Sequence, residues 1–507
     1  MKRRQFIQTC AAGALALGAD SDISAQPLSA AALEDAFRNP PSTALARTWW
    51  HWMNGNISEI GITRDLEAMK RVGCSGFQIF QVGTGIAKGP VDYGSPQHFA
   101  LLRHAAREAG RLGLEFAMHN CPGWSSSGGP WIPPELSMQS LTWTETVASG
   151  GQRVTLTLPQ PPARHDYYRD VMVLAVPAGP GEDVRPAIGA YSDGHITVEC
   201  PQAIEARSVT MYWTASAGGG VSIEASDDGV SYRKLVDFSA VQAPGRGGPL
   251  AHPMTASFPA VRTKFFRVAA ARPLTVTDVR FSEASRIANW AVKASFSGHF
   301  NAAAPAAAVE AGGPFAEAAQ VIDITGHMDA QGHLDWTAPA GNWVILRIGQ
   351  TTTGAINSPG PEGGVGLECD KFSREAYEFH FNKFFGPVMD AIAPLAARGM
   401  AGATIDSYET GLQNWTAKFP EEFGKRRGYD LKPYMPAMFG RVVGSPAISD
   451  RFLWDIRKTQ AELMQENYYG EFQRQCHKHA MKAFLEPYDP GNFDEMPTGQ
   501  YADMVMG

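Results

Sequence analysis

WWHW at residues 49–52, GFQIFQ at 76–81 and LEFAMHN at 114–120 are the runs that decide the fold. Each is a short β-type run. Leu66, Met69 and Val72 recur at three-residue spacing between the first two runs and predict a helix over 62–72. A second amphipathic stretch over 99–112 precedes the third run. This alternation of strand and helix predicts parallel βαβ units within residues 40–149.

The stretch from residue 150 to residue 350 has a different composition. It is rich in Gly, Pro, Thr and Val, and it has no long amphipathic helix. Residues alternate with period two in VTLTL at 154–158, in VSIEA at 221–225 and more loosely from Lys264 to Val268. These patterns predict an all-β insertion of one or two sandwiches. ASDDGVSY at 225–232 resembles the hairpin of discoidin-like sandwiches, which implies that the insertion is carbohydrate-binding.

The α/β alternation returns after residue 370. A helical stripe from Phe381 to Leu395, a strand over 403–406, a long helix over 452–479, a strand over 483–485 and the start of another over 501–506 are expected. Residues 40–149 and 351–507 then supply five strands and the start of a sixth for an α/β fold, a (β/α)₈-type barrel that needs eight. Because the sequence stops at Gly507, inside an expected strand, we expect a barrel truncated at its C-terminus. The alternative is an open doubly wound sheet, although no Gly-rich phosphate loop supports it.

Residues 1–25 have the three parts of an export signal. Lys2, Arg3 and Arg4 precede a weakly apolar stretch, and small residues at 23–25 offer a cleavage site. RRQFI at 3–7 resembles the twin-arginine type, whose route exports folded proteins. We therefore expect a periplasmic or secreted protein; the alternative is a chance basic start. No later apolar run is long enough for a transmembrane segment.

Composition excludes several classes of protein. The 507 residues carry a net charge of -7 and have no basic stripe, so nucleic acid is not an expected partner. The 6 cysteines are scattered without a CxxC pair, which argues against a zinc site and against a disulfide framework. Buried free thiols are the preferred interpretation.

Aromatic and polar side chains follow the ends of the predicted strands, the face where barrels carry their catalytic groups. Aromatic rings stack on sugar rings, and carboxylates and amides bind sugar hydroxyls, so the mixture predicts a carbohydrate site. His119 and Asn120 could equally satisfy backbone groups, and Asp406 could orient a hydroxyl or bind a cation. The substrate-binding candidates are Trp50, His51, His119, Asn120, Trp124, Asp406, Tyr408 and Tyr488.

Two glutamates lie just beyond strands and are the catalytic candidates. Glycosidases use one carboxyl group to protonate the leaving oxygen and another to activate water or attack the anomeric carbon. Glu409 and Glu486 fit these roles by position. The alternative for each is a solvated glutamate or a structural ion pair, and Glu486 also fits a supporting or metal-binding role.

Longer motifs resemble the α-L-rhamnosidases of glycoside hydrolase family 106 (GH106), from about residue 40 to the end. They are WWHWMNG at 49–55 with GITRDL at 61–66, HNCPGWSSSGGPW at 119–131, WVILRIG at 343–349, DSYE at 406–409 and FGKRRGYD at 423–430.

The resemblance implies a barrel with β-sandwich insertions, calcium dependence with ligands that cannot be assigned, and inverting hydrolysis of terminal α-L-rhamnose. Glu409, the glutamate of the Asp-Ser-x-Glu segment, would be the general acid. The base would be a glutamate directly after Met506-Gly507, so we expect the 507-residue chain alone to be inactive.

The leading hypothesis is therefore a hydrolase that removes rhamnose from oligosaccharides, polysaccharides or glycosides. A non-catalytic carbohydrate-binding fragment is the second, because one carboxyl group cannot complete a two-group mechanism. A glycosidase of another sugar specificity is the third, since a fold does not fix its substrate.

Overall fold

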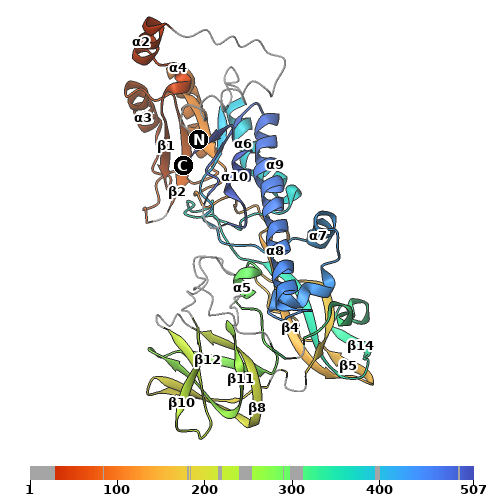
Figure 1. Ribbon diagram of the computed structural model, residues 1–507. Helices are drawn as coiled ribbons and strands as arrows, with labels where there is room; N and C mark the ends of the chain where they lie inside the picture. The colour runs from red at the N-terminus through yellow and green to blue at the C-terminus, as the bar shows by residue number, and fades with distance from the viewer. Residues whose placement is uncertain are drawn as a thin grey trace.

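Figure 1 shows a computed structural model of the chain. It describes residues 29–83, 85–179, 182, 184–214, 220–238, 254–288, 290–296, 312–313, 315–393, 400–488 and 491–506. The predicted export signal at 1–25 and the last residue of the helical stripe, Leu395, lie outside the described residues. None of the described helices is long and apolar enough to cross a bilayer.

Six parallel strands form one sheet in the order β1-β2-β3-β16-β17-β18. This confirms the predicted parallel α/β arrangement, including the start of a sixth strand. The described strands form an open sheet, so a closed eight-stranded barrel is not confirmed. The strands are β1 (Arg47–Met53), β2 (Gly76–Val82), β3 (Glu115–His119), β16 (Gly402–Ile405), β17 (Lys482–Leu485) and β18 (Met504–Val505).

Helices α3 (Glu59–Arg71) and α4 (Pro96–Leu112) connect the first three strands and lie together on one side of the sheet (Figure 1). Ser58 and Ser95 begin them, each with a hydroxyl that accepts a hydrogen bond from a backbone N–H of the first turn. Gly113 ends α4 in the left-handed conformation, at φ 68°. These caps fix where strand gives way to helix.

The second half of the chain supplies the remaining long helices. The helix expected over 452–479 is a continuous rod in which α8 passes through a π-helical turn, Met464–Tyr469, into α9 (Figure 1). The helices not yet given are α2 (Ala30–Arg38), α5 (Trp290–Lys293), α6 (Arg374–Ile392), α7 (Phe419–Arg427), α8 (Pro446–Leu463), α9 (Gly470–Lys478) and α10 (Glu495–Gly499). The 3₁₀ segments are Ser42–Ala44, Pro134–Leu136, Ala318–Gln320, Thr325–His327 and Lys432–Phe439.

Antiparallel strands fill the stretch between β3 and α6. They form a sheet β13-β6-β15-β4, a pair β14-β5, and a sheet β10-β9-β11-β8-β12 in which β7 also pairs with β8. Their bounds are β4 (Gln139–Ser149), β5 (Arg153–Thr157), β6 (Arg169–Ala178), β7 (Ala187–Ser192), β8 (His195–Thr214), β9 (Val221–Ser226), β10 (Tyr232–Phe238), β11 (Met254–Ala270), β12 (Thr275–Ser282), β13 (Ile322–Asp323), β14 (His333–Thr337) and β15 (Asn342–Thr352).

Strand β4 begins before residue 150, where the sequence predicts the insertion to start. Its run QSLTWTETVAS contains no Gly or Pro to mark the boundary, and it pairs with β15 along its whole length. Arg441 ties the β region to the helices, because its guanidinium donates to Glu145 of β4 at 2.6 Å and to Glu182 at 2.9 Å. The β8–β12 sheet has an apolar core of its own around Val209, Phe266 and Phe281.

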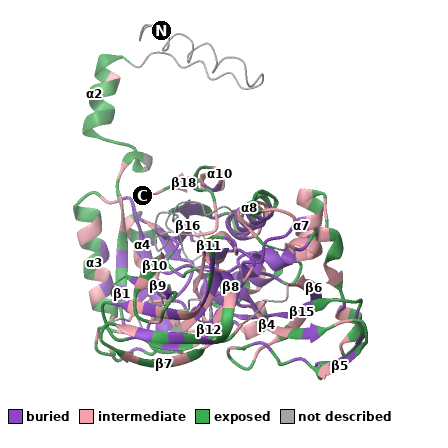
Figure 2. Ribbon diagram, turned by 60° about the horizontal axis from the view of Figure 1, so that its bottom comes forward, coloured by how far each residue is buried: buried purple, intermediate pink, exposed green. Residues whose placement is uncertain are grey.

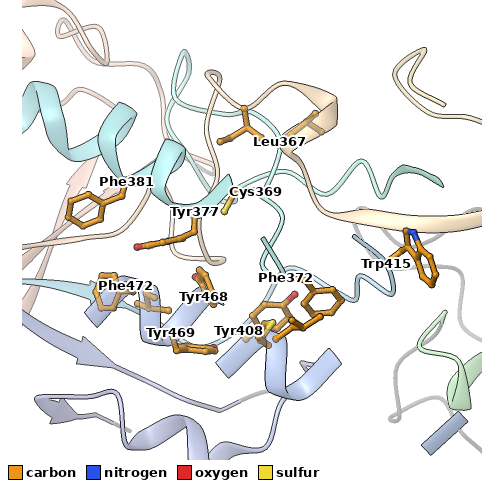
Figure 3. Packing of buried hydrophobic residues seen from close by; sticks show 14 of the residues in the cluster. Leu367, Cys369, Phe372, Tyr377, Phe381, Tyr408, Trp415, Tyr468, Tyr469 and Phe472 are labelled. Carbon is orange, nitrogen blue, oxygen red and sulfur yellow. The ribbon is translucent and has the colours of Figure 1, made fainter. Parts of the chain in front are cut away.

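Buried residues concentrate between the parallel sheet and the helices of the second half, whereas α2 is exposed along its length (Figure 2). Figure 3 shows part of this core, where Tyr377 of α6 meets Tyr468 at the π-helical turn. Their ring centroids lie 5.3 Å apart, nearly perpendicular. This aromatic layer is the rigid base on which the strand-end loops lie.

Candidate active site

Glu409 is exposed at the carboxyl end of β16. The indole Nε1 of Trp124 donates to its Oε2 at 3.2 Å, and the hydroxyl of Ser407 donates to its Oε1 at 3.0 Å. The backbone N–H of Glu409 donates to the carbonyl of Ser125 at 3.0 Å. Both oxygens are therefore held in place while the carboxyl group stays open to a ligand.

Two further carboxyl groups, both buried, lie close to the exposed carboxyl group of Glu409. Asp406 at the end of β16 and Glu486 at the end of β17 share a hydrogen bond, and both are buried. The hydroxyl of Tyr488 donates to Glu486 at 2.7 Å. Burial, followed by the hydrogen bond and the charge of Glu486, raises the pKa of Asp406 to about 8. At neutral pH this pair therefore retains a proton, and it differs chemically from Glu409.

Aromatic rings form a wall beside these acids. His51, Phe80 and His119 come from β1, β2 and β3, and the register places them in one row across the sheet. His51 packs against Phe80 at a tilt, with ring centroids 5.4 Å apart, and Trp124 meets His51 edge-on at 6.2 Å. Phe80 and His119 stack at 4.9 Å. Such a wall can hold the apolar face of a sugar ring.

His119 is neutral in this wall. Burial lowers its pKa to about 4, and the backbone N–H of Asp406 donates to its Nε2 at 3.4 Å. Its Nδ1 lies 3.0 Å from the carbonyl of Cys121, which fits a proton on that nitrogen. His119 therefore fixes the start of the Asp406 loop and is buried at the sheet end.

A fully buried ion pair lies under the loop that carries Trp124. The ammonium of Lys371 is 2.8 Å from Glu368, and both side chains have 0% exposure. Glu368 also accepts hydrogen bonds from the Ser125 hydroxyl at 2.7 Å and from the Ser127 N–H at 2.8 Å. Burial alone would raise the pKa of Glu368, but the charge of Lys371 and these hydrogen bonds hold it below its usual range.

This ion pair is a feature that the sequence analysis missed. ECDK at 368–371 follows no predicted strand, so its position gave no indication of a role near the site. The available signal was its setting: three charged residues between GGVG and the start of an apolar helix. Since Ser125 contacts both Glu368 and Glu409, the pair supports the site without reaching it.

The structure brings His51, His119, Trp124, Asp406, Glu409, Glu486 and Tyr488 to the same end of the sheet. Trp50 points to the other face, where its Nε1 donates to Asp65 of α3 at 3.1 Å. The structure therefore does not bring Trp50 together with the other candidates, because successive residues of a strand face opposite sides.

Asn120 and Tyr408 are also turned away from the open side. The side chain of Asn120 is buried, where its Oδ1 accepts from the Tyr377 hydroxyl at 2.9 Å, and its Nδ2 donates to Ser127. Tyr408 is buried against Phe493, with ring centroids 5.8 Å apart. For Asn120, the alternative of a structural role at a strand end fits these contacts. Asn120 holds the start of the loop that carries Trp124, and Tyr408 precedes the exposed Glu409.

The family model for the α-L-rhamnosidases of glycoside hydrolase family 106 matches residues 38–507. The chain belongs to this family. A solved structure, the rhamnosidase from Novosphingobium sp. PP1Y, superposes with a TM-score of 0.81 at 32% sequence identity, over 93% of this chain. A protein of Formosa agariphila named "Putative beta-glucuronidase" is 36% identical over 474 residues, which cover 94% of this chain.

The matched regions are parts of longer proteins. They cover 49% of the Novosphingobium chain and 32% of the Formosa protein. The present GH106 chain thus spans about half the length of the first and a third of the second. The comparisons therefore show that the chain belongs to the rhamnosidase family, of whose longer members it spans a part.

The family resemblance implies calcium dependence. Calcium takes about 6–8 oxygen ligands. Within the described ranges, no group of three or more His, Cys, Asp or Glu residues is placed to hold a metal ion. Asp406 and Glu486 share a hydrogen bond with each other. Calcium dependence therefore stays a prediction.

Proposed function

We propose that this GH106 chain carries the acid-bearing part of a site that releases terminal α-L-rhamnose with inversion, with Glu409 as the general acid. The observation that carries the proposal is the placement of Glu409. Its carboxyl group is exposed at a strand end, is held by Trp124 and Ser407, and stands beside the aromatic wall. A general acid must reach the leaving oxygen, and this is the exposed carboxyl group of the site.

The remaining residues divide the other tasks. The wall of His51 and Trp124 stacks on the sugar. The Asp406–Glu486 pair keeps its proton between the two carboxyl groups and accepts a hydrogen bond from a sugar hydroxyl. Glu486 is 3% exposed and is engaged by both Asp406 and Tyr488, so we assign it a positioning role. An inverting mechanism also needs a general base, with a water between that base and the anomeric carbon.

Glu409→Gln tests the proposal in the full protein as its gene encodes it. Loss of general acid catalysis should lower kcat on a natural rhamnoside by about 10²–10⁴-fold, with the fold intact by circular dichroism. The loss should be smaller on a rhamnoside with an activated leaving group, which needs little protonation. An equal loss on both substrates would contradict the assignment, and Glu421→Gln, an exposed glutamate of α7, is the matched control.

A β-glucuronidase is the second candidate, because one relative carries that name. A uronate carboxylate is ordinarily bound by a cation. The strand-end segments 406–409 and 486–488 contain neither Arg nor Lys, which favours the neutral sugar. Chromogenic α-L-rhamnoside and β-D-glucuronide, compared at equal concentration, separate the two. Sugar binding without turnover of either would favour the non-catalytic alternative.

We also propose that the protein is exported in the folded state. The support is the sequence at 1–25, with its paired arginines, apolar stretch and small-residue cleavage site. Replacing Arg3 and Arg4 by Lys should retain the protein in the cytoplasm, which cell fractionation would measure.

A further inference from the structure

A cavity of about 290 Å³ lies between α8 and the loop that follows β17. Trp454, Arg457, Lys458 and Ala461 line it from one face of α8, at the spacing that puts side chains on the same side of a helix. Residues 491–494 line the opposite side. Its volume is close to the lower end of known ligand sites, about 300–1,000 Å³, which is enough for one sugar ring.

The aromatic side of this cavity is open. The indole of Trp454 is 54% exposed. A large aromatic side chain at the edge of a cavity offers a flat apolar face, which suits the C–H face of a pyranose ring. This is the same kind of contact that the wall of His51 and Trp124 offers at the candidate active site.

The cavity also holds two cations. Arg457 is part-buried and donates to the carbonyl of Lys293 at 2.6 Å, and burial lowers its pKa. Asp450, the acid whose charge acts on Arg457, is itself paired with Lys293 at 2.6 Å. Among the described residues, neither Arg457 nor Lys458 forms an ion pair with a carboxylate. Asp494 is the acidic residue in the lining, so the cavity has a positive balance.

The loop across the cavity is fixed in place. The Asn492 amide donates to the carbonyl of Gln413 at 2.6 Å and to the side chain of Gln460 at 3.2 Å. Phe493 packs against Tyr408, the neighbour of Glu409 in sequence. These contacts hold the loop that lines the cavity, and Phe493 joins it to the segment that carries Glu409.

We propose that this cavity binds an anionic sugar residue, with Trp454 stacking on the ring and Arg457 and Lys458 binding its oxyanion. The proposal deepens the proposed function, because it makes the substrate an acidic polysaccharide whose charged residue is held beside the residue that is cleaved. A uronate carboxylate and a sulfate ester share this chemistry. Arginine and lysine bind both groups through charge-assisted hydrogen bonds.

Binding is measured by calorimetry on the full chain, so that turnover is not needed. The probes are tri-galacturonate, its methyl ester and a sulfated galactose trisaccharide. Tri-galacturonate or the sulfated sugar should bind, the methyl ester should bind about tenfold more weakly or less, and affinity should fall as salt is raised. The stronger of the two anions identifies the source of the charge.

Variants separate this cavity from the site of Glu409. Trp454→Ala and Lys458→Gln should each weaken binding by about tenfold or more, because each removes a direct contact with the sugar. Lys478→Gln, which removes an exposed charge at the end of α9, is the control and should bind as wild type.

Glu409→Gln should also keep its affinity for the anionic sugar, even if it has lost all activity. Equal binding of tri-galacturonate and its methyl ester, or equal effects of Lys458→Gln and Lys478→Gln, would overturn the proposal. So would the absence of binding by all three probes. Because these readouts do not involve hydrolysis, a failure here is distinct from a failure of the assigned acid.

Discussion

Lys371→Met should destabilise the folded protein by about 3–5 kcal/mol, because it leaves a buried carboxylate without its counter-ion. The ammonium and the Glu368 carboxylate are 2.8 Å apart at 0% exposure, so neither group reaches water. Met preserves most of the length of the lysine chain, so lost packing contributes little. The hydrogen bonds from Ser125 and Ser127 remain and place the expected loss toward the lower end of that range.

Denaturant unfolding followed by tryptophan fluorescence measures this loss, and hydrogen exchange over residues 121–128 shows whether the Trp124 loop loosens with it. Lys418→Met is the matched control, because its ion pair with Glu375 is about two-thirds exposed and should contribute only about 0–1 kcal/mol. The double variant Glu368→Gln/Lys371→Met should recover part of the loss, since no charge is then left buried. If Lys371→Met cost no more than Lys418→Met, the reasoning would be refuted.

Three further predictions follow from the site and the β region. The raised pKa of Asp406 means that the folded state holds a proton that the unfolded state loses. The free energy of unfolding should therefore fall as pH rises from about 4 to 8. Asp406→Asn should flatten that slope in denaturant titrations at several pH values. Gly123→Ala should loosen the Trp124 loop and weaken rhamnoside binding, because a Cβ would lie 2.7 Å from the Ser358 backbone at a φ of 85°. Titration calorimetry should show a lower affinity for the rhamnoside, and an unchanged affinity would contradict the prediction. Residues 139–352, expressed alone, should give the circular dichroism of a folded β protein, since β4 then keeps its partner β15; an unfolded spectrum would count against an independent module.

Much of the parallel sheet was predictable, because its strands are short apolar runs bounded by capped helices. The position of Glu409 at the sheet end was predictable for a related reason, because it closely follows such a run. The facing of Trp50 was not predictable, since WWHW is aromatic on both faces and its pattern does not say which face the helices cover. The inward direction of the Asn120 and Tyr408 side chains was not predictable either, because loops that leave a strand turn inward or outward according to distant contacts. The Glu368–Lys371 pair depends on such contacts entirely.

The position of the β region has a consequence for synthesis of the chain. β3 and β16 are neighbours in the sheet, yet Asp406 follows its hydrogen-bond partner His119 by 287 residues. At ribosomal rates of about 5–20 residues per second, the free edge of β3 waits roughly 15–60 s for its partner strand. During that time an apolar strand edge is open to other nascent chains. Export of the folded protein would place this vulnerable interval in the cytoplasm, where chaperones can shield the edge until β16 emerges.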